Sequence, residues 1–599
     1  MADNQKKIVP INYTSRDFSS IRDDLLELAE RLYPDSFQDF SEASFASLMV
    51  DAVSYVGDQL SFYLDYNVNE SFLDTAYQFN NILRHGRALG YKYTGRPSTY
   101  GPVALFILVP ASTTGIGPDT AYIPILKRGT QFSSTTGLSY TLIENVDFAA
   151  PANTVAVGRT DTTTGAPTHY AIKAFGTVVS GQFVTDRVKI GAFQKFLRVR
   201  MATPNLSEII SVFDTDGNEY FEVEYLAQDM IYKELPNMNY KKDNVPSVLK
   251  PYVVSRKFVV ERDTRDTYLQ FGSGKENATL EVADPQSVAM DVYGKTYTTS
   301  LTFDPTRLSQ NESLGTVPQN TTLIVTGRMT NPGNSNLAVG QLTTVNTSHF
   351  SFGKSIDELN ASKVSLVEGS LEVDNEVPIV GEVSIPNSAE VKQRVFDTFP
   401  TQNRAVTQAD YENLCYRMPA KFGSIKRVSA QRDPDSQKRN LNLYVISEDP
   451  FGSLIQTNAA IKNNLKTWLN QYRMINDTID ILNPYIINLG IEFSIRVISG
   501  TDKYSTIDAC IDALAGSYES GFFIGESFSI SDVYQILGGV AGVLDVLKVR
   551  VYCKTGVDYS SATIDINSNL SPAGDQLIIP QNAIVELKYP STDITGKAR

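Results

Sequence analysis

Apolar residues recur at three- and four-residue spacing from Ser15 to about Tyr93, and this period predicts helices. The segment RDFSSIRDDLLELAERLYP is expected to form a short helix that ends at Pro34, because proline cannot continue a helix. Its apolar stripe consists of Phe18, Ile21, Leu25, Leu28 and Leu32.

A second, longer helix is predicted from about Glu42 to Val68, with Ser41 as its N-terminal cap. Asp51, Asp58 and Asp65 recur every seven residues and are expected to lie along one solvated edge. The helix would have about seven turns, where the average helix has about three. Two interpretations stay open: a core helix of its own domain, or a helix shared with a partner chain. Its apolar positions are Phe45, Leu48, Met49, Ala52, Val53, Val56, Leu60, Tyr63 and Leu64.

Between about Pro97 and Val383 the pattern changes to short β-rich runs, such as VALFILVP and YFEVEYL, separated by turn residues. The stretch DTDGNEYFE, Asp214 to Glu222, superficially resembles a calcium loop. An EF-hand needs its glycine at position six between two helices, whereas Gly217 is fourth and strands flank it. The Asp216-Gly217 pair therefore predicts a hairpin turn.

From about Ile385 strands and helices alternate, which is typical of α+β sandwiches. A helix is predicted from Ser388 to Phe399, and a capping box, Thr407 and Asp410, begins the next one. The fold class expected is thus a multidomain α+β protein with a helical N-terminal segment, a β-rich middle and α+β sandwich domains at the C-terminus. The regions are residues 1–96, 97–385 and 386–599, the last with a C-terminal strand.

The glycines in ISDVYQILGGVAGVLDVLKVRV invite comparison with a phosphate-binding loop. Such loops place glycines before a helix, and a P-loop adds a lysine followed by serine or threonine. Here Ser529 to Leu537 has the helical period, so Gly538, Gly539 and Gly542 follow the helix, and LDVLKVRV alternates as a strand. The pattern predicts a helix, a glycine stop and a strand, with no bound nucleotide.

Composition narrows the function classes. The net charge of −14 repels phosphate backbones and anionic lipid, so neither nucleic acid nor a membrane is an expected partner. The N-terminus lacks the apolar core of a signal peptide, and a soluble chain is expected. Three widely spaced cysteines, Cys415, Cys510 and Cys553, are expected as buried free thiols. Because the histidines are equally scattered, we expect no catalytic site, no cofactor and no metal: they are His85, His169 and His349.

Three groups of motifs, in order along residues 13 to 555, resemble one family. The first is NESFLDTAYQFNNILRHGRALGYK at Asn69 to Lys92, and the third is the C-terminal series from VTQADYENL to SISDVYQILGGVAGVLDVLKVRV. The second comprises Arg128-Gly129-Thr130, Phe271-Gly272, Gly274, Tyr293 and the loop Asn331 to Asn334. Together they resemble phage baseplate wedge proteins of the baseplate J-like family.

This resemblance implies a structural, non-enzymatic subunit of a contractile phage tail baseplate, located in the virion and assembled in the host cytoplasm. It implies that a second copy and a different wedge subunit join through N-terminal helices, and that C-terminal domains of neighbouring copies close a ring around the tail tube. Other baseplate and tail-tube-proximal proteins are implied partners. The expected bundle interface consists of Phe45, Met49, Val53, Val56, Leu60 and Tyr63.

Two alternatives from other classes remain. A tail-associated glycan hydrolase would need two carboxylates about 5–10 Å apart in a cleft, and the chain has many acidic residues. A receptor-binding tail protein would favour repeats, and the sequence has no fixed-period repeat.

Overall fold

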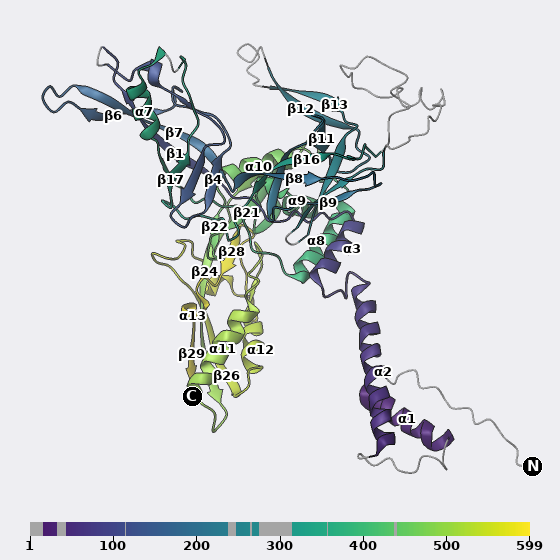
Figure 1. Cartoon of the computed structure of the whole chain (residues 1–599). Helices are drawn as coiled ribbons and strands as arrows, with labels where there is room; N and C mark the ends of the chain where they lie inside the picture. Colours follow the sequence, from purple (N-terminus) through teal and green to yellow (C-terminus); the bar gives the residue numbers. More distant parts are fainter. Residues whose placement is uncertain are drawn as a thin grey trace, which may run out of the picture. The chain divides into compact units, whose positions relative to one another are not determined.

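The computed structural model describes residues 16–32, 44–113, 116–237, 247–263, 266–274, 314–355, 358–435 and 440–599 (Figure 1). Pro34, Ser41 and Tyr293, named above, lie outside the described residues. The chain forms two compact units, one comprising Met1–Tyr91 with Asn387–Phe396 and the other Lys92–Pro386 with Asp397–Arg599.

The first unit is helical. It contains α1 (Phe18–Leu32), α2 (Phe45–Glu70), α3 (Phe79–Ala88) and the beginning of α8 (Ser388–Thr401). Helices α3 and α8 approach closely at Gly86, where an added Cβ would lie 2.9 Å from Cγ2 of Val395. A glycine at this position therefore allows two segments far apart in sequence to pack together.

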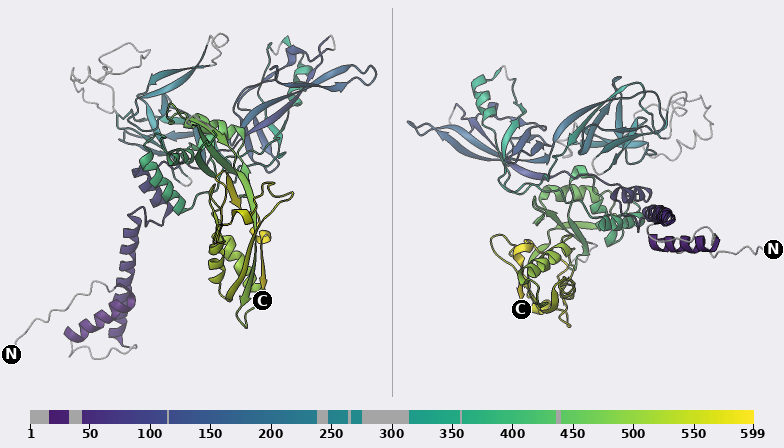
Figure 2. Two further views of the ribbon diagram at one scale, coloured as in Figure 1. Left: turned by 180° about the vertical axis from the view of Figure 1, so that it is seen from behind. Right: turned by 60° about the horizontal axis from the view of Figure 1, so that its bottom comes forward.

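The second unit begins with two seven-stranded sheets, which Figure 2 shows from two further sides. The first has the order β17-β3-β4-β7-β1-β19, with β6 paired to β7, and helix α7 (Ala361–Gly369) packs on β1. Its core is built from alternate residues of these strands, including Leu105, Phe132 and Ile172. Its strands are β1 (Tyr100–Pro110), β3 (Gln131–Ser134), β4 (Ser139–Leu142), β6 (Thr154–Thr160), β7 (Pro167–Ser180), β17 (Leu342–Thr347) and β19 (Glu372–Asp374).

The other large sheet has the order β8-β16-β10-β11-β14-β15-β9 and its own core around Val212, Phe258 and Phe271. Its strands are β8 (Gln182–Lys189), β9 (Arg198–Arg200), β10 (Leu206–Phe213), β11 (Glu219–Glu222), β14 (Lys257–Arg262), β15 (Thr267–Phe271) and β16 (Thr322–Met329). Two small sheets accompany the large ones: β12 (Met230–Pro236) with β13 (Ser247–Val253), and β2 (Ile125–Leu126), β5 (Val146–Asp147) and β18 (Phe350–Ser351).

The C-terminal region contains two α+β lobes. The first has the sheet β20-β21-β22, with β23 beside β21, and helices α9 and α10. Its elements are α9 (Gln408–Tyr416), β20 (Arg427–Arg432), β21 (Asn440–Glu448), β22 (Leu454–Gln456), α10 (Ala459–Leu469) and β23 (Thr478–Leu482). The capping box of Thr407 and Asp410 is present, as predicted.

The last lobe is a sheet of order β26-β24-β28, with β29 beside β24, covered by α11 and α12. Its elements are β24 (Tyr485–Val497), α11 (Lys503–Ser517), β25 (Phe528–Ser529), α12 (Ile530–Gly538), β26 (Val543–Cys553), β27 (Gln576–Leu577), β28 (Ala583–Glu586), α13 (Pro590–Asp593) and β29 (Ile594–Ala598). The predicted fold class is confirmed: a helical N-terminal segment, a β-rich middle and an α+β C-terminal region.

The glycine stop lies between α12 and β26 in this lobe. Gly542 has a φ of +97°, and an added Cβ would lie 3.2 Å from Oγ1 of Thr506. Both the backbone conformation and the close contact favour glycine. The predicted order of helix, glycines and strand is confirmed.

The loop Asn331 to Asn334 is largely exposed and leads directly into a buried polar cluster of the second unit at Ser335 and Asn336. The Glu382 carboxylate accepts hydrogen bonds from Arg96 Nε at 2.7 Å and from Ser335 N at 2.7 Å. The Asn336 amide donates to the carbonyl oxygens of Glu382, at 2.7 Å, and Glu448, at 2.8 Å. Because these groups satisfy one another, the loop is fixed between the β-rich region and β21.

Candidate assembly surface

Helix α2 buries small polar side chains and exposes large apolar ones. It has 26 residues, begins after the N-cap Ser44, and its buried side chains are Ser47, Ser54 and Glu70. The predicted start near Glu42 lies outside the described residues; where the structure describes the chain, the Ser44 hydroxyl accepts the N–H of Ser47 and caps the helix.

Helix α1 packs against the small-residue side of α2. At Gly57 an added Cβ would lie 3.2 Å from Cδ1 of Ile21 on α1. The aspartates expected along a solvated edge lie on this same side: Arg22 Nε is 2.6 Å from Asp51 Oδ1, and Arg16 Nη1 is 2.9 Å from Asp65 Oδ1. The edge stays partly exposed, with Asp51 and Asp65 at 39% and 55%, and it also provides ion-pair partners for Arg22 of α1 and for Arg16, which precedes α1.

The six predicted interface side chains lie together on the other side of α2. All six are exposed in the single chain. Their exposed fractions are Phe45 75%, Met49 52%, Val53 54%, Val56 55%, Leu60 58% and Tyr63 56%. Side chains of this kind are usually buried, so a row of them marks an interaction surface.

A second row, which the sequence analysis did not assign to an interface, runs beside the first. It consists of Leu48, Tyr55 and Phe62, with exposed fractions of 62%, 60% and 61%. Their seven-residue recurrence is the signal that would have identified them. At 3.6 residues per turn the two rows together span roughly 200° of the helix circumference, which is more than one packed helix covers.

The motif that follows α2 fixes the end of this helix. One carboxylate oxygen of Glu70 accepts the N–H groups of Tyr77 at 2.8 Å and Gln78 at 3.1 Å, and the other accepts from the Asn81 amide at 2.8 Å. The carbonyl oxygen of Glu70 lies 2.8 Å from His85 Nε2. The hydrogen bond from Asn81 is the main reason that the pKa of Glu70 lies below its usual value.

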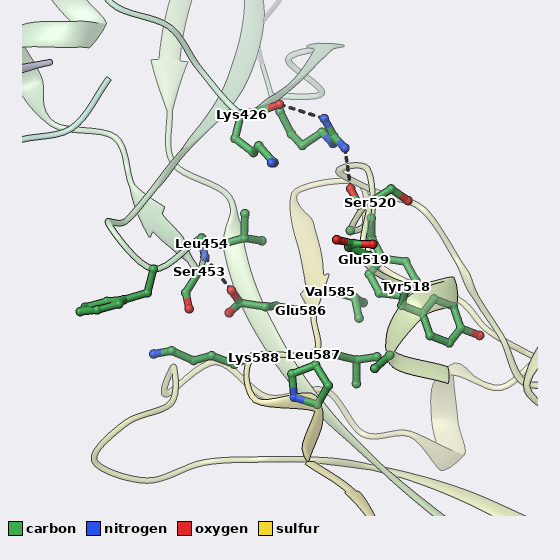
Figure 3. Close-up of a pocket in the computed structure, with 17 residues that line it drawn as sticks. Lys426, Ser453, Leu454, Tyr518, Glu519, Ser520, Val585, Glu586, Leu587 and Lys588 are labelled. Carbon is green, nitrogen blue, oxygen red and sulfur yellow. Dashed lines mark hydrogen bonds between the residues drawn. The ribbon is translucent and has the colours of Figure 1, made fainter. Parts of the chain in front are cut away.

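A pocket in the C-terminal region is lined by two glutamates, Glu519 and Glu586, and a glycan hydrolase would need such a pair of carboxylates (Figure 3). Both oxygens of Glu586 accept hydrogen bonds, one from Leu454 N at 2.6 Å and one from the Asn488 amide at 2.8 Å. Burial raises the pKa of this carboxyl. We interpret Glu586 as a structural acid that joins β22 and β24 to β28.

Across the described ranges, no group of three or more histidine, cysteine, aspartate or glutamate side chains is arranged to hold a metal ion. Among the helices that the structure describes, none combines the length and the apolar character needed to cross a bilayer. Cys415 and Cys510 are buried free thiols, and Cys553 is half-buried.

The N-terminal helices indicate the class of protein. Residues 17–88, which include α1, α2 and α3, match the sequence model of the family described as bacteriophage baseplate protein, N-terminal domain. The segment that carries the exposed rows is thus similar to the N-terminal domain of baseplate proteins, and the class supported is a structural baseplate protein. No curated protein matches the chain.

Chains from two solved assemblies were also found as matches. A chain of the anti-feeding prophage (AFP) baseplate, from a 6-fold symmetrised cryo-EM structure, has 10% identity and a TM-score of 0.24, covering 96% of this chain and 90% of that one. A chain of the type VI secretion system TssK-TssF-TssG baseplate subcomplex has 9% identity and a TM-score of 0.23, covering 73% and 96% respectively. With such low TM-scores, neither defines the fold of the present chain.

Proposed function

We propose that this protein is a structural, non-enzymatic subunit of a contractile phage tail baseplate wedge of the baseplate J-like type. Helix α2 joins a second copy and a different wedge subunit in a helical bundle, and C-terminal lobes of neighbouring copies close a ring around the tail tube. The protein would then reside in the tail baseplate of the virion, after assembly in the host cytoplasm. The exposed apolar side of α2 is the observation that carries this proposal.

The exposed apolar side of α2 is wide enough to suggest contacts with two partner helices. Both rows contain side chains at the seven-residue spacing of a coiled-coil seam. These are Met49, Val56 and Tyr63 within the first row of six, and Leu48, Tyr55 and Phe62 in the second row. Burying an exposed side chain of this size contributes about 1.5–3 kcal/mol, so each row offers enough energy for stable association. Two adjacent seams suit a bundle in which α2 contacts two other chains.

The proposal is tested by placing charges in the first row. We expect Val53→Asp with Val56→Asp to abolish co-purification with the other wedge subunit, because burying two carboxylates in an apolar seam is too costly. The chain itself should keep its circular dichroism spectrum, since both valines are already exposed in it. Val155→Asp with Val157→Asp is the matched control, because these β6 valines have similar exposed fractions, 48% and 52%.

A variant in the second row separates the two partners. Tyr55→Asp with Phe62→Asp should remove one component of the wedge, and the first-row variant should remove the other, as measured by the mass of the purified complex. If both variants form wedges of normal composition, α2 is only an internal element and the proposal is wrong.

A further inference from the structure

The last lobe carries opposite charges on its two faces. Helices α11 and α12 cover one face of the sheet formed by β24, β26 and β29, as Figures 1 and 2 show. Along β24 the buried Ile491 and Phe493 alternate with Glu492 and Ser494, which are only partly buried. Because successive side chains point to opposite faces, Glu492 and Ser494 lie on the face away from the helices.

This open face is basic. Arg550 is directly opposite Glu492, and Lys548 is directly opposite Ser494, so both bases share the open face. On the other side of β24, Lys597 pairs with Ser494 and its Nζ lies 2.6 Å from Oε1 of Glu492. Lys597 first, and then Arg550 and Lys548, lower the pKa of Glu492. The local field is therefore positive, although the whole chain has a net charge of −14.

The helical face is acidic. Residues 502–540 contain six acidic side chains and one basic side chain, Lys503. Asp508 and Asp512 on α11 and Asp532 on α12 are all exposed. A groove between the two helices is lined by Ser517, Asp532, Gln535 and Gly539, among others. The small residues leave room there for long basic side chains of another molecule.

We propose that copies of this chain associate head to tail, with the basic open face of β24, β26 and β29 of one copy against the acidic α11 and α12 layer of the next. The inference rests on the proposed function, which requires neighbouring copies to meet through this region, and it specifies the two faces that meet. A contact between two different faces is heterologous, and such contacts close rings when the rotation between copies allows it. Charge complementarity selects the second copy as the occupant of both faces.

Two charge-reversal variants of the full chain test this proposal. Each is made in a chain that carries Tyr55→Asp with Phe62→Asp, so that the proposed contact between copies through α2 is absent, and that chain is the unmodified reference. One changes the open face, Lys548→Glu with Arg550→Glu. The other changes the helical face, Asp508→Lys and Asp512→Lys with Asp532→Lys, which shifts the net charge of residues 502–540 from −5 to +1. In each variant both faces then have the same sign. We expect the dissociation constant for self-association, measured by sedimentation, to rise about a hundredfold, since like charges in contact cost several kcal/mol and each 1.4 kcal/mol is tenfold.

Mixing the two variants supplies the decisive result. In an equimolar mixture the acidic helical face of the first variant meets the basic open face of the second, and the reversed faces also match. Association should therefore return to within about threefold of the unmodified chain, which loss of folding could not produce. Lys189→Glu with Lys195→Glu, at two exposed positions in the β-rich region, is the control for net charge.

The outcomes that overturn the proposal are distinct. A mixture that stays unassociated, a control that weakens association equally, or an unmodified chain that remains monomeric at high concentration would each contradict it. Should a reversal variant lose its circular dichroism spectrum, Lys548→Gln with Arg550→Gln replaces it and should weaken association about tenfold. The Val53→Asp, Val56→Asp chain should self-associate normally, so failure of wedge assembly and failure of this contact are separately visible.

Discussion

Helices α2 and α11 both have an apolar stripe in the sequence, but they use it in opposite ways. In α11 the stripe lies inside its own lobe, where Leu514 is 0% exposed beside Phe493 and Leu537. In α2 the stripe faces outward, and Leu60 is 58% exposed. The comparison shows that a helical period reveals an apolar side, whereas the rest of the chain decides whether that side is core or surface.

The largest expected effect comes from a matched pair of leucines. Leu514→Ala should lower the free energy of unfolding of the last lobe by about 3 kcal/mol, because it leaves a cavity in a packed core. Leu60→Ala should change the stability of the single chain by no more than about 0.5 kcal/mol. Hydrogen exchange of the two helices in denaturant measures both, and a large loss with Leu60→Ala would show that α2 is a core helix.

The small-residue side of α2 sharpens the contrast. Within the described residues, the hydroxyl of Ser54 is buried and finds no hydrogen-bond partner. Ser54→Ala should therefore stabilise the contact with α1 by about 1 kcal/mol, because an unsatisfied buried polar group is removed. The midpoint of thermal unfolding of the N-terminal helices reports the change. A decrease in that midpoint would mean that the hydroxyl has a partner, such as a water molecule.

A smaller effect is expected for the ion pair between Arg22 and Asp51, which is partly exposed. Arg22→Ala should weaken the attachment of α1 by less than about 1 kcal/mol, and the weakening should shrink further in high salt. Protease cleavage between α1 and α2 would measure it. An effect that is equally strong in high salt would indicate lost packing of the arginine stem instead of lost charge.

The smallest effect is a pH dependence at Glu70. Its pKa lies below the usual value of 4.5 in the folded chain, so the unfolded chain binds more protons below about pH 4.5. The stability contributed by this carboxylate is present above that pH and is lost as the pH falls through the folded pKa. Hydrogen exchange at Tyr77 and Gln78 should show the loss, and Glu70→Gln should flatten it. Equal pH profiles for the two chains would contradict the assignment.

Local signals in the sequence predicted local structure well. The capping box at Thr407 and Asp410 begins α9, and Asp216-Gly217 forms the predicted turn between β10 and β11, with Gly217 at a φ of +82°. In that turn the Asp214 carboxylate accepts N–H groups of Asp216 and Asn218 at 3.0 and 2.8 Å. These features depend on residues within a few positions of one another, and a single sequence contains that information.

What the sequence left open depends on distant residues. Asp51 and Asp65 were expected along a solvated edge, and their side chains remain 39% and 55% exposed. Their ion pairs with Arg22 on α1 and with Arg16 just before α1 were not predicted, because the partners are distant in sequence. Tyr55 and Phe62 were not assigned to an interface, since the period of a helix does not say how wide its contacted side is. The basic face of the last sheet was missed for a similar reason, because its basic residues lie on β26 and β29, two strands that only the fold brings to either side of β24.

The exposed side of α2 also limits how long the free chain survives. An exposed apolar surface of this width lets identical chains adhere when they meet. The rate of such meetings rises with the square of the chain concentration. In the proposed wedge, partner helices would cover this surface and prevent such aggregation. The proportion in which the subunits are synthesised would then decide whether newly made chains enter particles or aggregates, so that supply of the partner would control the yield kinetically.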